Sequence, residues 1–322
     1  MFVEGKKKTV LIFTLLLIAL IQMPHLALTP GIDLIATKIF PERSIQTIQT
    51  VVSLPNILSA IAGLLAAMVI KSGIATKKAL VVTGLLILGA TGAVAVLLHS
   101  QFWQLCLMNV LVGLGMGTFI PSAQSVMFDS FDEKTRQFIS GAQFSFVNGG
   151  AIILGILGGV LTTVVWYGGY LMMFAAIPVA AIAFITLPGS GKKTAQEKVK
   201  KTPLPGAVYY YAVMIFIYMM MFSIATSNLS THLAESHIGD AASAGVATAL
   251  MMGGGVIGGF FFSKMSRAFG DFLFVISLVL LCIGYAILGF LTPSITATFA
   301  AMFIVGLSMC TFIPRCVFCV SC

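Results

Sequence analysis

The chain has 322 residues, of which 59% are hydrophobic and only 9% are charged, and its mean hydropathy is +1.06. These values exclude an ordinary water-soluble domain and indicate an integral membrane protein. The net charge of +8 would suit a nucleic-acid-binding protein, but the basic residues form short clusters between apolar segments. We therefore expect them to flank membrane spans, and we expect no nucleic acid as a partner.

Ten apolar segments are long enough to cross a hydrocarbon core of about 30 Å as α-helices. The first follows the basic sequence MFVEGKKK; it is too long for a signal peptide, and many more spans come after it. The sequence therefore predicts an all-α membrane protein with about ten transmembrane helices. The predicted spans are residues 9–28, 48–70, 79–98, 102–124, 138–165, 167–187, 207–227, 241–262, 272–291 and 295–313.

Lysine and arginine fall on one side of these spans. Of the 18 lysines and arginines, sixteen lie in the segments that flank the spans on one side of the membrane. Only Lys38 and Arg43 lie in the segments on the other side. Because cytoplasmic loops of membrane proteins carry the excess of basic residues, we expect the N-terminus to be cytoplasmic. The chain is then a multi-pass protein of the cell (plasma) membrane, in contact with the lipid bilayer.

The sequence contains an internal repeat. LVGLGMGTFIP at residues 111–121 returns as IVGLSMCTFIP at residues 304–314, with eight of the eleven positions identical. The same offset of 193 residues aligns Lys71 with Lys264 and indicates a duplication. Each span and its repeat are six helices apart in the sequence. Because six is an even number, the two copies are expected to cross the membrane in the same direction. Parallel repeats of this kind are typical of one class of secondary transporters.

The repeat predicts the domain organisation. Residues 1–187 are expected to form an N-terminal six-helix bundle, and the polar segment 188–205 has the composition of a cytoplasmic linker. Residues 206–322 are expected to form four helices of a second bundle. By the repeat, two further helices should follow, but the sequence ends with RCVFCVSC. We therefore expect a chain that is truncated after its tenth helix.

With this topology and repeat, the chain resembles the major facilitator superfamily, in which two six-helix bundles rock about a central substrate cavity. The family's loop between the second and third spans carries an acidic residue, a glycine and clustered basic residues, which latch helices together. The equivalent loop here has Lys71, Gly73, Lys77 and Lys78, with Ile70 about where the acid is expected. The resemblance implies a gating role for this loop, and simple positive-inside charges are the alternative.

Glycines in the fourth and fifth spans predict close helix packing. Asn109 stands where the family commonly has an arginine, which argues against its commonest proton-antiport arrangement. The fifth-span sequence NGGAIILGILGG is similar to a motif of the family's exporters and favours efflux; ordinary helix packing is the alternative. Pro121 and Pro314 are expected to break two equivalent helices locally. The residues assigned to packing or gating are Gly113, Gly117, Pro121, Gly155, Gly159 and Pro314.

No Asp or Glu lies inside a predicted span, so the candidates for binding a solute are neutral polar residues and one histidine. The resemblance implies that the first, fourth, seventh and tenth spans surround the cavity. His25 is the only ionisable group in the selected set and could carry a coupling proton; an interfacial or capping role is the alternative. The candidate substrate-binding residues are Gln22, His25, Asn109 and Asn228.

The seventh span contains YYYAVMIFIYMMMF, and such aromatic and methionine surfaces suit varied apolar shapes. We therefore expect alternating-access transport of a small lipophilic or amphipathic solute by a monomer. A proton or ion is a candidate coupling partner, and no cofactor is expected. A truncated, non-transporting membrane protein is the alternative.

We do not expect an enzyme, because no span carries a carboxylate pair, a nucleophile with a base, or a set of metal ligands. The sequence contains two groups of potential zinc ligands. Neither has a fourth ligand or a second cluster with which to complete a zinc site, so no metal is expected. The two groups are His232, Glu235 and His237, and Cys316, Cys319 and Cys322.

Overall fold

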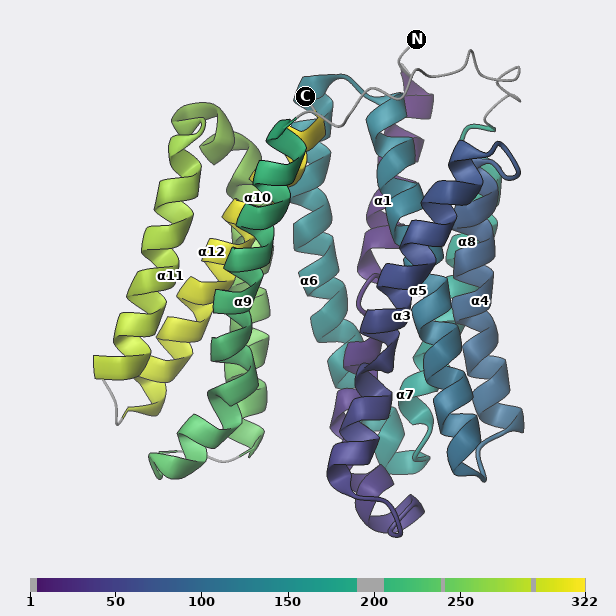
Figure 1. The fold of residues 1–322 in the computed structure, drawn as a ribbon, viewed down its shortest axis with the longest axis vertical. Coiled ribbons are helices and arrows are strands. Elements are labelled where there is room, and N and C mark those ends of the chain that lie inside the picture. The colour runs from purple at the N-terminus through teal and green to yellow at the C-terminus, as the bar shows by residue number, and fades with distance from the viewer. Residues whose placement is uncertain (1–4, 190–205, 239–240, 291–293, 322) are drawn as a thin grey trace. The chain divides into compact units, whose positions relative to one another are not determined.

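The computed structural model describes residues 5–189, 206–238, 241–290 and 294–321 (Figure 1). Within these ranges the chain is helical and contains no strand, which confirms the all-α membrane fold. Nine of the described helical segments are long and apolar enough to cross a membrane. The long helices are α1 (Lys6–Leu20), α3 (Ile45–Lys71), α4 (Lys77–Leu97), α5 (Phe102–Ser130), α6 (Glu133–Val164), α8 (Ala176–Thr186), α9 (Gly206–Glu235), α10 (Ala241–Phe269), α11 (Phe272–Phe290) and α12 (Ile295–Ser321).

The first predicted span differs from the single helix expected over residues 9–28. α1 ends at Leu20, and short helical turns then continue from Pro24 to Ile39, among them α2 (Ile32–Leu34). Met23, directly before the proline, has φ −117° and ψ 56°, outside the helical region. Proline has no amide hydrogen and disfavours helical geometry in the preceding residue, so Pro24 explains the interruption.

Contacts within the chain divide it into two compact units. Unit 1 comprises Met1–Phe131 with Gly150–Lys198, and unit 2 comprises Asp132–Gly149 with Val199–Cys322. The sequence assigned all of α6 to the N-terminal bundle, whereas residues 132–149 group here with unit 2. Most of the expected linker, 188–205, lies outside the described residues, so the domains 1–187 and 206–322 stay a prediction.

Unit 1 is built around α5, which packs against both α3 and α4. Small residues allow the close approach: a Cβ atom added to Gly84 of α4 would lie 2.9 Å from the carbonyl oxygen of Gly115 in α5. The sixth span consists of α7 (Gly168–Leu171), one short turn and α8, and it packs on α4. Met108, Val112 and Phe119 fill the core of this unit.

Unit 2 has the same arrangement around α12, which packs against α10, α11 and α9. Gly306 of α12 lies against the backbone of Met251 in α10. Tyr218 of α9 stacks on Phe312 of α12, with ring centroids 4.1 Å apart and planes 9° apart. The Tyr218 and Ser308 hydroxyls are 2.7 Å apart, so the buried phenol is hydrogen-bonded. α12 is therefore the central helix of unit 2.

The two units support the predicted duplication helix by helix. Shifted by 193 residues, the start of α5 at Phe102 falls on Ile295, where α12 begins, and the end of α4 at Leu97 falls on Phe290, where α11 ends. The contacts repeat as well. Gly113 packs against Leu58 in unit 1, and the residues one offset later, Gly306 and Met251, pack in unit 2. The repeat therefore extends from the sequence to the packing.

Candidate functional site

An ion pair joins the start of α4 to the end of α5 in unit 1. Lys77 Nζ lies 2.5 Å from Asp129 Oδ2. The Thr76 side chain caps α4 by accepting a hydrogen bond from Ala79 N at 3.1 Å, which fixes the backbone that carries Lys77. The Asp129 side chain is 61% exposed, so the pair contributes at most about 1 kcal/mol to stability. Asp129 supplies the acidic partner that the basic loop lacks.

The rest of the basic loop is held in other ways. Gly73 has φ +71°, a conformation that disfavours any residue with a Cβ, so glycine is required at this turn. Lys78 Nζ lies 5.1 Å from the centre of the Phe184 ring in α8, within the range of a cation–π interaction. Lys71, the last residue of α3, is exposed. The structure thus distinguishes the three lysines by their surroundings.

Unit 2 has an equivalent ion pair with the charges exchanged. Arg315 Nη2 of α12 lies 2.7 Å from Oδ1 of Asp271, the residue before α11 begins. In unit 1 the basic residue is at the start of α4 and the acidic residue is on α5. In unit 2 the acidic residue is directly before α11 and the basic residue is on α12. The Arg315 side chain is only 12% exposed and Nη1 also donates to Ser266 Oγ at 3.0 Å. Both helix pairs are therefore tied at equivalent ends.

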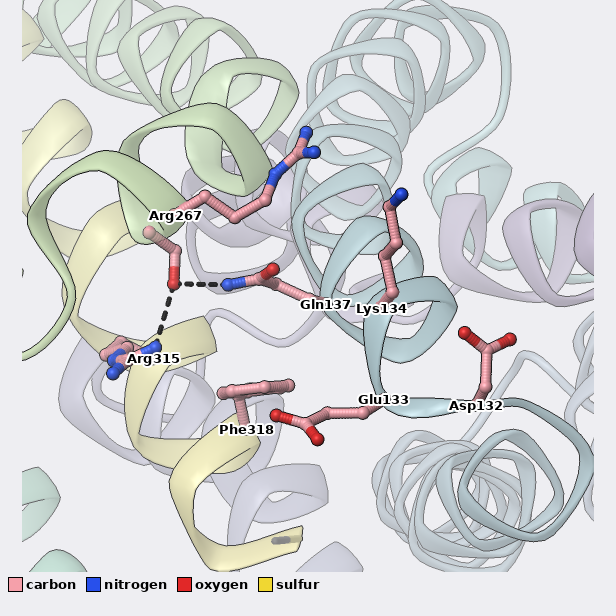
Figure 2. Close-up of a pocket in the computed structure, with 8 residues that line it drawn as sticks. Asp132, Glu133, Lys134, Gln137, Arg267, Arg315 and Phe318 are labelled. Carbon is pink, nitrogen blue, oxygen red and sulfur yellow. Dashed lines mark hydrogen bonds between the residues drawn. The ribbon is translucent and has the colours of Figure 1, made fainter.

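A cavity of about 590 Å³ lies beside Arg315 within unit 2 (Figure 2). Gln137 of α6 reaches the same serine as Arg315, because its Nε2 donates to Ser266 Oγ at 2.6 Å. The sequence does not predict this site, since its residues come from three separate segments. The lining residues are Asp132, Glu133, Lys134, Gln137, Ser266, Arg267, Arg315 and Phe318.

The break after α1 contains two of the predicted solute-binding residues. Gln22 Nε2 and His25 Nδ1 are both shielded from solvent, and neither has a hydrogen-bond partner among the described residues. The carbonyl of Ala27 packs against Gly158 of α6, where an added Cβ would lie 2.5 Å from the oxygen. Non-helical backbone at membrane depth is tolerated only where protein or water covers it. This segment therefore presents unsatisfied polar groups at an interrupted span.

Asn109 is completely buried within unit 1. Its Nδ2 donates to Leu105 O at 2.9 Å and to the hydroxyl of Tyr170, in α7, at 2.7 Å. Its Oδ1 has no partner among the described residues. Tyr170 was not predicted from the sequence, because nothing in the pattern pairs α5 with α7. Asn109 therefore links two helices and still has one free acceptor.

The other predicted residue, Asn228, lies on α9, but its side chain is outside the part that the structure describes. Asn56, a polar residue of the second span, is exposed on α3. The structure therefore groups Gln22 with His25 at one break and leaves Asn109 in a separate helix contact.

The glycines assigned to packing or gating lie in different environments. Gly113 and Gly117 of α5 both face α3; a Cβ on Gly113 would lie 2.7 Å from Leu58 Cβ. On α6, the Gly155 position has Leu26 O as its nearest atom, at 3.8 Å, so it is loosely packed. Gly159 is partly buried on the same helix.

The two repeat-related prolines lie inside helices. α5 continues past Pro121 to Ser130, and α12 continues past Pro314 to Ser321. Both segments were expected to break locally at proline. The helical path nevertheless persists in both, because packing on neighbouring helices compensates for one missing backbone hydrogen bond.

Two units of apolar helices with the same internal packing define a multi-pass membrane protein with an internal repeat. A family model described as the Major Facilitator Superfamily matches residues 9–316. The chain therefore belongs to the Major Facilitator Superfamily, a family of membrane transporters.

A comparison with solved structures supports the fold. The human organic anion transporter MFSD10 (TETRAN) superposes with a TM-score of 0.73 over 99% of this chain and 86% of that chain, at 13% sequence identity. At this identity the likeness shows the fold alone. A search of curated protein sequences finds no match. The family match and the structural match establish the family and the fold but not the solute.

Proposed function

We propose that the chain moves a small lipophilic or amphipathic solute across a membrane by alternating access. The observation that carries this proposal is the chemistry of the interior. Among the described residues, the buried polar side chains other than tyrosine are Ser, Thr, Asn and Gln, without a carboxylate or a basic group. A strongly charged solute in a low-dielectric interior needs a compensating charge. Neutral hydrogen-bonding groups favour a solute with a large apolar part.

The surface of α9 supports the same class of solute. Phe216 is 65% exposed and Met220 56% exposed, within a run of aromatic and methionine side chains. These residues point in several directions around the helix, so one part of the run faces lipid and another part is available to line a solute path. MFSD10 is described as an organic anion transporter. The fully buried side chains of the described residues include no Lys or Arg and no Asp or Glu. This favours a solute that is neutral, or whose charge is shielded by a large apolar surface.

The finer features of the proposal follow from the sequence. Efflux is favoured by the similarity of NGGAIILGILGG in α6 to a motif of the family's exporters. In this segment Gly150 and Gly158 pack closely on the interrupted first span. The bias of basic residues supports a cytoplasmic N-terminus and a plasma-membrane location. His25 is the candidate for carrying a coupling proton, because it is the only ionisable group among the predicted solute-binding residues. The transporter acts as a monomer and without a cofactor.

The ion pair between Lys77 and Asp129 acts in this proposal as a latch that favours one of the two conformations. Lys77→Gln and Asp129→Asn should each change the transport rate about threefold to fivefold, as expected for a loss of up to about 1 kcal/mol in one state. The double variant should resemble either single variant, because both substitutions remove the same interaction. Initial rates in proteoliposomes measure this.

Lys71→Gln is the matched control for the latch. It removes the same charge from the same basic region, at the exposed end of α3. Its rate should stay close to that of the unmodified protein. Equal effects of Lys71→Gln and Lys77→Gln, or additive effects of Lys77→Gln and Asp129→Asn, would show that only the general positive charge of the loop matters.

Reconstitution into sealed vesicles tests the proposed function itself. Vesicles containing the purified chain and an internal pool of unlabelled tetraphenylphosphonium should take up the labelled compound transiently and saturably, as in counterflow. Glucose 6-phosphate, a polar anion, should give no counterflow. Uptake of tetraphenylphosphonium that rises linearly with concentration and equals that of protein-free vesicles would refute the proposal.

A further inference from the structure

The cavity beside Arg315 in unit 2 lies outside the polar groups used in the proposed transport path. It is formed by the start of α6, the end of α10 and the last turns of α12 (Figure 2). Arg267 and Lys134 border one side of it, and Phe318 lies across from them (Figure 2). Arg315 lies over the Phe318 ring, 5.5 Å from its centre. The cavity thus combines three basic side chains with one aromatic ring.

The cavity has a surplus of hydrogen-bond donors. Ser266 Oγ accepts from Gln137 and from Arg315, and its own hydroxyl proton has no acceptor among the described residues. Ser266 is only 3% exposed. Arg315 Nε is also shielded from solvent and finds no acceptor. Because buried donors are normally satisfied, these two unsatisfied groups favour a ligand that offers acceptor oxygens.

The charges around the cavity favour an anion. Lys134, Arg267 and Arg315 line it. Arg315 Nη2 is paired with Asp271, whereas its Nε is not paired, and the Arg267 Nε bond to Ser263 O leaves the end of that guanidinium available. Of the two lining carboxylates, Asp132 is engaged at the start of α6, where it accepts from Thr135 Oγ1 at 2.6 Å. Glu133 is exposed and weakens the positive field. Arginine and lysine together, with surplus donors, are the groups that recognise phosphate oxygens.

We infer that this cavity binds a phosphate group, carried by an anionic lipid headgroup or by a soluble phosphorylated compound. The basic residues place this end of unit 2 at the predicted cytoplasmic face, where anionic lipids are abundant and where basic pockets between helices hold their headgroups. A phosphate would accept from Ser266 and Arg315 and would contact Lys134 and Arg267. It would thereby bridge α6, α10 and α12 within unit 2.

Two probes distinguish the sources of the phosphate. The purified full chain in detergent is titrated with inorganic phosphate in one arm and with dihexanoyl phosphatidic acid in the other, and binding is measured by calorimetry. Dihexanoyl phosphatidylcholine, whose phosphate is shielded by choline, serves as the lipid comparator. Saturable binding of phosphatidic acid alone assigns the site to a headgroup, and binding of inorganic phosphate assigns it to a soluble compound. Failure of both probes to bind saturably overturns the inference, whatever the transport assay shows.

Three variants locate the binding. Arg267→Gln should weaken phosphate binding about tenfold, as expected for the loss of one charge-assisted contact. Lys264→Gln, on the exposed surface of the same helix and outside the cavity, should leave it unchanged. Glu133→Gln should tighten it, because a repulsive charge is removed. Equal weakening by Arg267→Gln and Lys264→Gln, or weaker binding in Glu133→Gln, would overturn the assignment to this cavity.

Discussion

Gly117→Ala is expected to destabilise unit 1 by about 3 kcal/mol, near the upper end of the range for overpacking. The added Cβ would overlap the carbonyl oxygen of Ser59 and lie 2.6 Å from Ala62 Cβ. Both neighbours are on α3, and neither can move without shifting the helix. Thermal unfolding of the purified protein in detergent should therefore show a clearly lower midpoint for this variant.

Gly155→Ala is the matched control for that substitution. Gly155 is also a glycine within a membrane helix, but its nearest neighbour is Leu26 O at 3.8 Å, an ordinary contact distance. Alanine favours the helix over glycine by up to about 1 kcal/mol, so this variant should be as stable as the parent protein or slightly more stable. A similar loss in both variants would mean that the α3–α5 contact is not tightly packed in the membrane protein.

Substitution of two unsatisfied polar groups in unit 1, those of Gln22 and Asn109, is expected to affect transport most. Gln22→Ala removes a shielded Nε2 donor that has no partner in the described protein, and Asn109→Ala removes a buried Oδ1 acceptor that has none. If these groups contact the solute, counterflow should fall about tenfold, the effect of one lost hydrogen bond in a dry site. Asn56→Ala, at an exposed position of α3, should transport normally.

A structural effect at Asn109 can be separated from a binding effect. Tyr170→Phe removes the hydroxyl that accepts from Asn109 Nδ2 and leaves the Asn109 side chain in place. If Asn109 acts only by joining α5 to α7, Tyr170→Phe and Asn109→Ala should lower the unfolding midpoint and the transport rate in parallel. If Asn109 binds solute, only Asn109→Ala should raise the concentration for half-maximal counterflow. Unimpaired counterflow in both Gln22→Ala and Asn109→Ala would contradict the assignment of these residues to the solute path.

The helices could be predicted from the sequence because apolar length is enforced by the thickness of the bilayer. Nine described segments confirm this, and the repeat of residues 111–121 at 304–314 correctly indicated that α5 and α12 have equivalent neighbours. The apolar pattern does not predict the interruption after Leu20, although Pro24 is present in the sequence. Hydropathy does not register a missing backbone donor, so a single apolar run predicts a single helix.

The partners of the site residues could not be predicted in the same way. Lys77 and Asp129 are separated by two helices in the sequence, and only the antiparallel packing of α4 on α5 brings them together. Tyr170 of α7 and Asn109 of α5 are likewise far apart in the sequence and meet only in the folded unit. The phosphate cavity draws on α6, α10 and α12. No local pattern encodes such a combination, because each residue by itself is typical of a solvated loop or helix end.

Alternating access is tested most directly by the accessibility of position 25. In a chain whose six native cysteines are replaced by serine and that still performs counterflow, His25→Cys is exposed to a membrane-impermeant thiol reagent from either side of sealed vesicles. We expect tetraphenylphosphonium to shift the labelling of the His25→Cys variant from one side of the membrane towards the other. Labelling from the same single side with and without the solute would contradict it.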